Sequence, residues 1–143
     1  MKAILYPAIV VMVMACTQKS DQSHEHHRSS TPENANQVLY NEVMDIHDEV
    51  MPRMEDLYNA KKDLQEKIAN TPAIAEEERL QLEQRITHID SVSNLMMVWM
   101  RQFNPLPDSA DQEAARAYLE SEMEKIKNVR EAMLSTLEAE KEN

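Results

Sequence analysis

Apolar side chains recur along the chain at alternating steps of four and three residues, in three long segments separated by proline-containing breaks. This is the spacing of a coiled-coil seam, in which each helix presents one apolar stripe to its neighbours. The seam positions are Val43, His47, Val50, Met54, Leu57, Lys61, Leu64 and Ile68, then Leu82, Ile86, Ile89, Ser93, Met96, Met100 and Phe103, and finally Leu119, Met123, Ile126, Val129, Met133 and Leu137. The pattern predicts helices over about 33–69, 72–103 and 110–141.

Prolines and capping residues set the expected ends and interruptions of these helices. Pro52 lies inside the first segment, and because it has no N–H to complete the helical hydrogen bond, we expect a kink there. Thr71 is a candidate N-cap, followed by Pro72 in the first helical position. Ser109 and Gln112 have the spacing of a capping box at the start of the third helix.

Short connections between long helices make neighbouring helices antiparallel. The sequence therefore predicts an all-α fold, an elongated, coiled-coil-like antiparallel three-helix bundle formed by residues 33–143. A second row, expected to widen the apolar face of the first helix, consists of Met44, Met51 and Tyr58. When equal numbers of residues are counted in both directions from the turn at Asn70, Met96 lies opposite His47. Trp99 is then expected to pack near Met44 and Val43.

The N-terminal residues have the features of a secretory signal that ends in a lipid-attachment site. A lysine precedes an apolar stretch much shorter than the roughly 20 residues that span a bilayer. The only cysteine, Cys16, directly follows the lipobox residues Val13, Met14 and Ala15. We expect residues 1–15 to be removed as a signal peptide and the Cys16 sulfur to carry a lipid that anchors the protein. The alternative is an ordinary signal peptide that is cleaved without lipid attachment.

Residues 16–32 are expected to form a disordered tether behind the lipidated cysteine, because between Cys16 and Pro32 they contain no apolar side chain larger than threonine. With the lipid anchor, we expect the protein in the cell envelope, at the outer membrane in preference to the inner membrane, which is the alternative. A polar stretch containing Asp21 resembles the surface-export signals of Bacteroidota lipoproteins, but Lys19 departs from that pattern. The periplasmic and the surface face of the membrane therefore both stay open.

Composition excludes several classes of protein. Glycine is absent from all 143 residues, which argues against glycine-rich phosphate loops, dinucleotide-binding folds and tight hairpins. Aromatic residues make up 4% of the chain and no alternating β-branched runs occur, so a sheet is not expected. The formal net charge of −11 disfavours nucleic-acid binding, which needs clustered Lys and Arg.

Methionine and histidine offer the one candidate site for a cofactor, either copper or zinc. Imidazole binds both metals, and thioethers favour Cu(I). The candidate ligands are Met44, His47, Met51 and Met54 on the first helix, with His24, His26 and His27 in the tether. The alternative interpretation is that the methionines pack the core and that the tether histidines are solvated.

No motif indicates an enzyme. A di-metal carboxylate bundle needs Glu-x-x-His pairs on facing helices, and no Glu-x-x-His occurs in the chain. Cys16 belongs to the anchor, and no serine lies in a recognisable nucleophile motif. We therefore expect no catalytic residues.

Three segments resemble a known family. They are Glu42 to Met54 (EVMDIHDEVMPRM), Leu95 to Phe103 (LMMVWMRQF) and the pattern from Tyr118 to Ile126. Together with the lipobox they resemble small helical Bacteroidota lipoproteins often labelled "viral A-type inclusion protein". The resemblance implies a helical envelope lipoprotein and assigns no functional residues.

Three hypotheses for the function follow from these observations. The first is a lipid-anchored, extracytoplasmic helical rod that acts as an interaction or structural protein of the envelope. The second is a metal-binding or metal-sensing envelope protein. The third is a subunit of a larger envelope assembly. The membrane is the first expected partner, through the lipid on Cys16, and a protein partner or self-association is the second.

Overall fold

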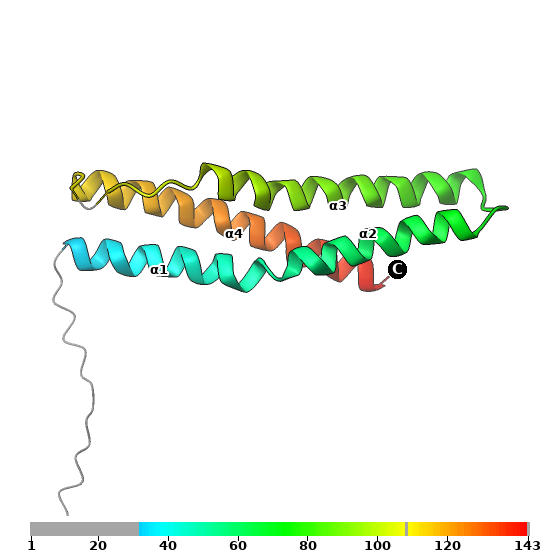
Figure 1. The fold of residues 1–143 in the computed structure, drawn as a ribbon, viewed down its shortest axis with the longest axis horizontal. Coiled ribbons are helices and arrows are strands. Elements are labelled where there is room, and N and C mark those ends of the chain that lie inside the picture. Colours follow the sequence, from blue (N-terminus) through cyan, green and yellow to red (C-terminus); the bar gives the residue numbers. More distant parts are fainter. Residues whose placement is uncertain (1–31, 108, 143) are drawn as a thin grey trace, which may run out of the picture.

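The computed structural model describes residues 32–107 and 109–142, and this part of the chain is entirely helical apart from its turns. The helices are α1 (Pro32–Val50), α2 (Arg53–Asn70), α3 (Glu76–Gln102) and α4 (Gln112–Glu142). They pack into one elongated bundle (Figure 1). The all-α helical bundle expected from the seam pattern is therefore confirmed.

The first two helices follow one another along one side of the rod, α3 runs back antiparallel to them, and α4 returns in the direction of α1 (Figure 1). Helix α1 packs mainly on α4 and α2 mainly on α3. The C-terminus of α4 lies part of the way along α2, so the far end of the rod is formed by α2 and α3 alone. At 1.5 Å per residue, the span from α1 through α2 measures roughly 58 Å.

The single helix expected over 33–69 is instead two helices, because it breaks at Pro52. The last regular bond of α1 runs from the Met51 N–H to the His47 carbonyl at 2.8 Å. Pro52 has no N–H to donate, and the Met54 N–H, two residues further on, bonds to the Met51 carbonyl at 3.2 Å. The kink expected at this proline is thus a break between two helical segments.

The second expected helix starts four residues later than the sequence indicated. Thr71 does not cap it: the Ile74 N–H bonds to the Thr71 carbonyl at 3.0 Å in a turn, and α3 begins at Glu76 without a side-chain cap. The longer connection shifts the facing residues by about one helical turn. Trp99, rather than Met96, therefore lies opposite His47.

The start of α4 also differs from the expected capping box. The Ala114 N–H donates to Asp111 Oδ1 at 2.9 Å, so Asp111 caps this helix in place of Ser109. A carboxylate is favoured there because it faces the positive end of the helix dipole. Helix α3 ends at Gln102, one residue before the expected end.

The core follows the three predicted seams. The buried apolar positions are Val43, Val50, Leu57, Leu64, Leu82, Ile89, Val92, Met96, Trp99, Leu119, Met123, Ile126, Val129, Met133 and Leu137. The expected second row does not widen this core, because Met51 is 37% exposed and Tyr58 is 66% exposed. Over residues 32–107 and 109–142, none of the helices has the length and apolar character needed to cross a membrane.

Candidate functional site

The side chains considered as metal ligands lie in unlike environments along the first two helices. Two of them, Met44 and Met54, are half-buried, and a third, Met51, is 37% exposed. The His47 ring faces Trp99, with centroids 5.9 Å apart, and its Nδ1 lies 2.8 Å from Asp48 Oδ1. Within the described residues, no group of three or more His, Cys, Asp or Glu side chains is placed to hold a metal ion. Copper or zinc binding by this face stays a prediction.

The remaining candidate residues from the sequence lie outside the part of the chain that the structure describes. They are the lipidation residue Cys16, the lipobox residues Val13, Met14 and Ala15, and the tether histidines His24, His26 and His27. The lipid anchor and the tether therefore also stay predictions.

A layer of aromatic rings joins α1, α3 and α4. The Phe103 ring stacks on Trp99 at 4.8 Å and lies 6.1 Å from Tyr40 and 6.3 Å from Tyr118, between ring centroids. Trp99 in turn faces His47. Among the described residues no Cα atoms of α1 and α3 approach within 8 Å, so these large side chains fill the space between the two helices. The layer therefore has a structural role in holding α1 to α3.

Two polar atoms are buried near this layer without a hydrogen-bond partner among the described residues, Trp99 Nε1 and Glu122 Oε2. The Glu122 side chain is 3% exposed, and its other oxygen accepts a 2.7 Å hydrogen bond from Lys125 Nζ. This hydrogen bond and the charge of Glu122 raise the pKa of Lys125 above its ordinary value of 10.5. The stability that comes from the raised pKa of Lys125 is present below the titration range of lysine and is lost as the pH rises through that range.

Sequence reasoning missed Glu122, although a signal was present. It lies three residues after Leu119 and four before Ile126, so it is on the same helical face as the seam, directly before the seam residue Met123. A carboxylate at such a position is either a functional group or a cost to stability, because burial removes its hydration.

We expect Glu122→Met to raise the free energy of unfolding by about 1–2 kcal/mol, since it replaces a desolvated, half-paired carboxylate by an apolar side chain of similar length. Urea denaturation followed by circular dichroism measures this change. Lys125→Met is the control and should destabilise, because it leaves the buried carboxylate without its counter-charge. A destabilised Glu122→Met protein would show that Glu122 has a partner that the structure does not display.

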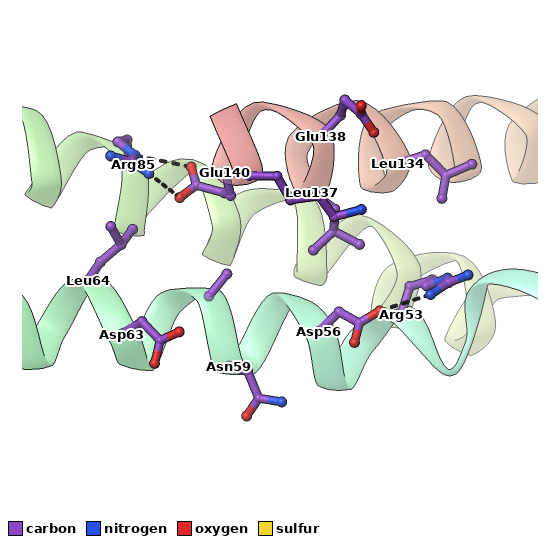
Figure 2. A pocket seen from close by; sticks show the side chains of 12 residues that line it. Arg53, Asp56, Asn59, Asp63, Leu64, Arg85, Leu134, Leu137, Glu138 and Glu140 are labelled. Carbon is purple, nitrogen blue, oxygen red and sulfur yellow. Dashed lines mark hydrogen bonds and ion pairs between the residues drawn. The ribbon is translucent and has the colours of Figure 1, made fainter. Parts of the chain in front are cut away.

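An open groove runs between α2 and the last turns of α4, over α3 (Figure 2). Its volume is about 690 Å³, within the range of ligand-binding pockets. The lining residues are Arg53, Asp56, Asn59, Ala60, Asp63 and Leu64 of α2, Arg85 of α3, and Leu134, Leu137, Glu138, Glu140 and Lys141 of α4. We call this feature the α2–α4 groove. The α2 side spans three helical turns, roughly 17 Å.

Aliphatic side chains form the middle of the α2–α4 groove. Leu64 of α2 and Leu137 of α4 line it at different positions along its length (Figure 2), and both are largely buried. Ala60 and Leu134 line it as well and are half-buried. Leu134 is the one leucine of this set that is not part of the buried core cluster, so its apolar surface faces the groove and not the bundle interior.

Both arginines of the groove are already engaged by carboxylates. Arg53 Nη1 lies 3.1 Å from Asp56 Oδ2 on the same helix. Arg85 binds Glu140 with two hydrogen bonds, from Nη2 at 2.6 Å and from Nε at 3.2 Å. This second pair links α3 to the last turns of α4, and its bidentate geometry fixes both side chains.

Three charged side chains of the groove have no hydrogen bond or ion pair among the described residues. They are Asp63, Glu138 and Lys141. Asp63 belongs to the α2 wall and Glu138 to the α4 wall, and both are exposed. The groove thus combines an apolar middle with two free carboxylates and one free ammonium group, which makes its unpaired charge negative.

Comparison with family models, with curated proteins and with solved structures found no match, so no residue role is transferred from a relative.

Proposed function

We propose that this chain is a lipid-anchored, extracytoplasmic helical rod that binds a protein partner in the cell envelope. The α2–α4 groove is the observation that carries this proposal. It is an accessible concave surface with an apolar middle, and such surfaces are the usual sites of recognition. A lipid on Cys16 would hold the tether at the membrane, and the tether would join the rod at the start of α1.

The composition of the groove favours binding over catalysis. Its lining contains no histidine, cysteine or serine, so it offers neither a thiol or serine nucleophile nor an imidazole base. Its placement supports the same reading. Helix α1 separates the tether from the groove by about 30 Å, which would keep the groove clear of the membrane surface.

The anchor makes the first prediction about function. We expect Cys16→Ser to move the protein from the membrane fraction to the soluble fraction and to abolish labelling by radioactive palmitate, because the thioether-linked lipid would be lost. Cell fractionation and autoradiography measure both effects, with Ser20→Ala as the matched control. A Cys16→Ser protein that is still labelled and membrane-bound would refute the lipid anchor.

Site-specific cross-linking in intact cells tests the binding role of the groove. A photoreactive residue at Asp63, on the groove rim, should give a discrete adduct that Leu134→Gln on the opposite wall weakens. The same residue at Tyr58, which is 66% exposed on α2 and outside the groove, should not give it. Equal adducts from both positions would contradict a binding role for the groove.

A further inference from the structure

We infer that the partner held by the α2–α4 groove is a basic amphipathic helix. This inference rests on the proposed function, since it names the chemistry of the occupant of the same groove. It follows from three properties of the groove: the backbone of its walls, the chemistry of its lining and the sign of its unpaired charge.

The backbone of the walls selects a helical occupant. Both walls are α-helices, whose N–H and C=O groups bond within the helix except at its first and last turns. Along most of the groove, an extended segment would therefore find no free backbone groups with which to pair, and each unpaired group that it buried would cost free energy. A helix brings its own backbone hydrogen bonds, so it can bury apolar side chains without that cost.

The spacing of the lining also fits a helix. The α2 wall presents Arg53, Asp56, Ala60 and Asp63, at steps of three, four and three residues, and the α4 wall presents Leu134, Leu137 and Lys141 at steps of three and four. These are the rows into which the side chains of a neighbouring helix interdigitate. An incoming helix of about three turns would complete a four-helix arrangement with α2, α3 and α4.

The lining chemistry argues against other peptide classes. Proline-rich ligands dock on aromatic side chains, and the groove lining has no Phe, Tyr or Trp. Phosphopeptides need free arginines, but Arg53 and Arg85 are each held by a carboxylate. The aliphatic middle instead suits leucine-type anchors on one face of a helix.

The unpaired charge selects a basic flank. Asp63 and Glu138 stand on opposite walls without partners, against the single free ammonium of Lys141. Lysine or arginine beside the apolar stripe of an incoming helix would reach one carboxylate on each side. The formal charge of the whole chain, −11, attracts such a segment over longer distances.

Two other possible occupants, a second copy of this chain and its own tether, do not match the chemistry of the groove. A second copy of this acidic chain would bring like charge to the groove. Residues 17–31 of this chain contain no apolar side chain larger than threonine, so the tether could not fill the aliphatic middle. A separate, basic protein segment satisfies both requirements.

Peptide titration with the full chain carrying Cys16→Ser tests the inference. The probe is a fluorescein-labelled synthetic peptide of about five helical turns, with leucines at positions i, i+4, i+7 and i+11, lysines at the positions beside this stripe and alanines at the remaining ones, which favour a helix. One control peptide replaces lysine by glutamate, and a second has the same composition with leucine at alternate positions, which removes the helical stripe. We expect fluorescence anisotropy to show saturable binding of the first peptide and affinities at least about tenfold lower for both controls.

Two variant proteins place this binding in the groove. Asp63→Lys combined with Glu138→Lys should lower the affinity for the lysine peptide by about tenfold or more and raise the affinity for the glutamate peptide. Glu42→Lys combined with Asp45→Lys makes the same change of net charge on the exposed face of α1 and should alter binding much less. All four positions are exposed, so both proteins are expected to fold, which circular dichroism checks.

Each other outcome overturns the inference in a recognisable way. Equal losses from the two charge variants would mean that the peptide is held by general attraction and not by the groove. Dimerisation of the chain that Leu134→Gln abolishes, measured by sedimentation, would make a second copy the occupant. A groove-specific adduct in cells without selective binding of the basic helix would refute the partner class and leave the proposed function standing, whereas loss of both results would refute both.

Discussion

Replacing Trp99 by alanine should lower the free energy of unfolding by about 3–5 kcal/mol. Trp99 is 4% exposed and lies between His47 of α1 and Phe103 at the end of α3. Its removal would leave a large cavity where the backbones of α1 and α3 are too far apart to close it. Urea denaturation followed at 222 nm measures the effect, and the loss should be accompanied by faster amide hydrogen exchange in α1.

Trp99→Phe separates the loss of the ring from the loss of the indole N–H. Phenylalanine keeps an aromatic ring in the stack and removes Nε1, a buried donor without a partner among the described residues. We therefore expect a loss of only about 1–2 kcal/mol. If Trp99→Phe were as damaging as Trp99→Ala, Nε1 would have a hydrogen-bonding role and the packing explanation would be wrong. A loss below about 1 kcal/mol for Trp99→Ala would show that α1 can move to close the cavity.

The helical bundle and most of its core could be predicted from the sequence because the apolar period is long and regular. Val43, Val50 and Leu57 recur every seven residues, and the structure buries all three completely. All side chains of such a stripe lie on one face of a helix, so packing that face against neighbouring helices removes the whole stripe from water. The period therefore predicted the burial of these side chains without any knowledge of the partner helices.

Helix ends and facing positions were predicted less well, because they depend on local competition that the apolar period does not report. Thr71 and Pro72 have the identities of a helix start, yet the chain forms a turn there and α3 starts at Glu76. That difference of four residues placed Trp99, and not Met96, opposite His47. Asp111 displaced Ser109 as the cap of α4 for a similar reason, since both residue types are good caps.

The candidate groove could not be predicted, because it arises from the path of α4 relative to α2. Ala60 and Leu134 have no special spacing in the sequence, and only the packing shows that they line one surface with Leu64 and Leu137. The pairing of Arg85 with Glu140 across 55 positions is likewise a consequence of the antiparallel register. The sequence predicts a protein partner or self-association, but it does not indicate which surface that partner would use.

Two neighbouring residues on α2 should give opposite results on substitution by alanine. Leu57 is completely buried and Tyr58 is 66% exposed. We expect Leu57→Ala to lower the free energy of unfolding by about 2–5 kcal/mol, through lost burial and a residual cavity. Tyr58→Ala should change it by less than about 0.5 kcal/mol, because the larger part of the ring is already in water. The pair distinguishes the single-seam core from the wider face that the row of Met44, Met51 and Tyr58 indicated.

The same pair of variants separates folding from binding, because neither residue lines the α2–α4 groove. Chemical denaturation gives the stability of each protein. Fluorescence anisotropy with the lysine peptide, measured in buffer without urea, where Leu57→Ala is still folded, gives its affinity. Leu57→Ala should then bind with unchanged affinity despite its lower stability. A stability loss for Tyr58→Ala that matches that of Leu57→Ala would mean that Tyr58 is covered in solution, and that α2 has a further contact on the side away from the groove.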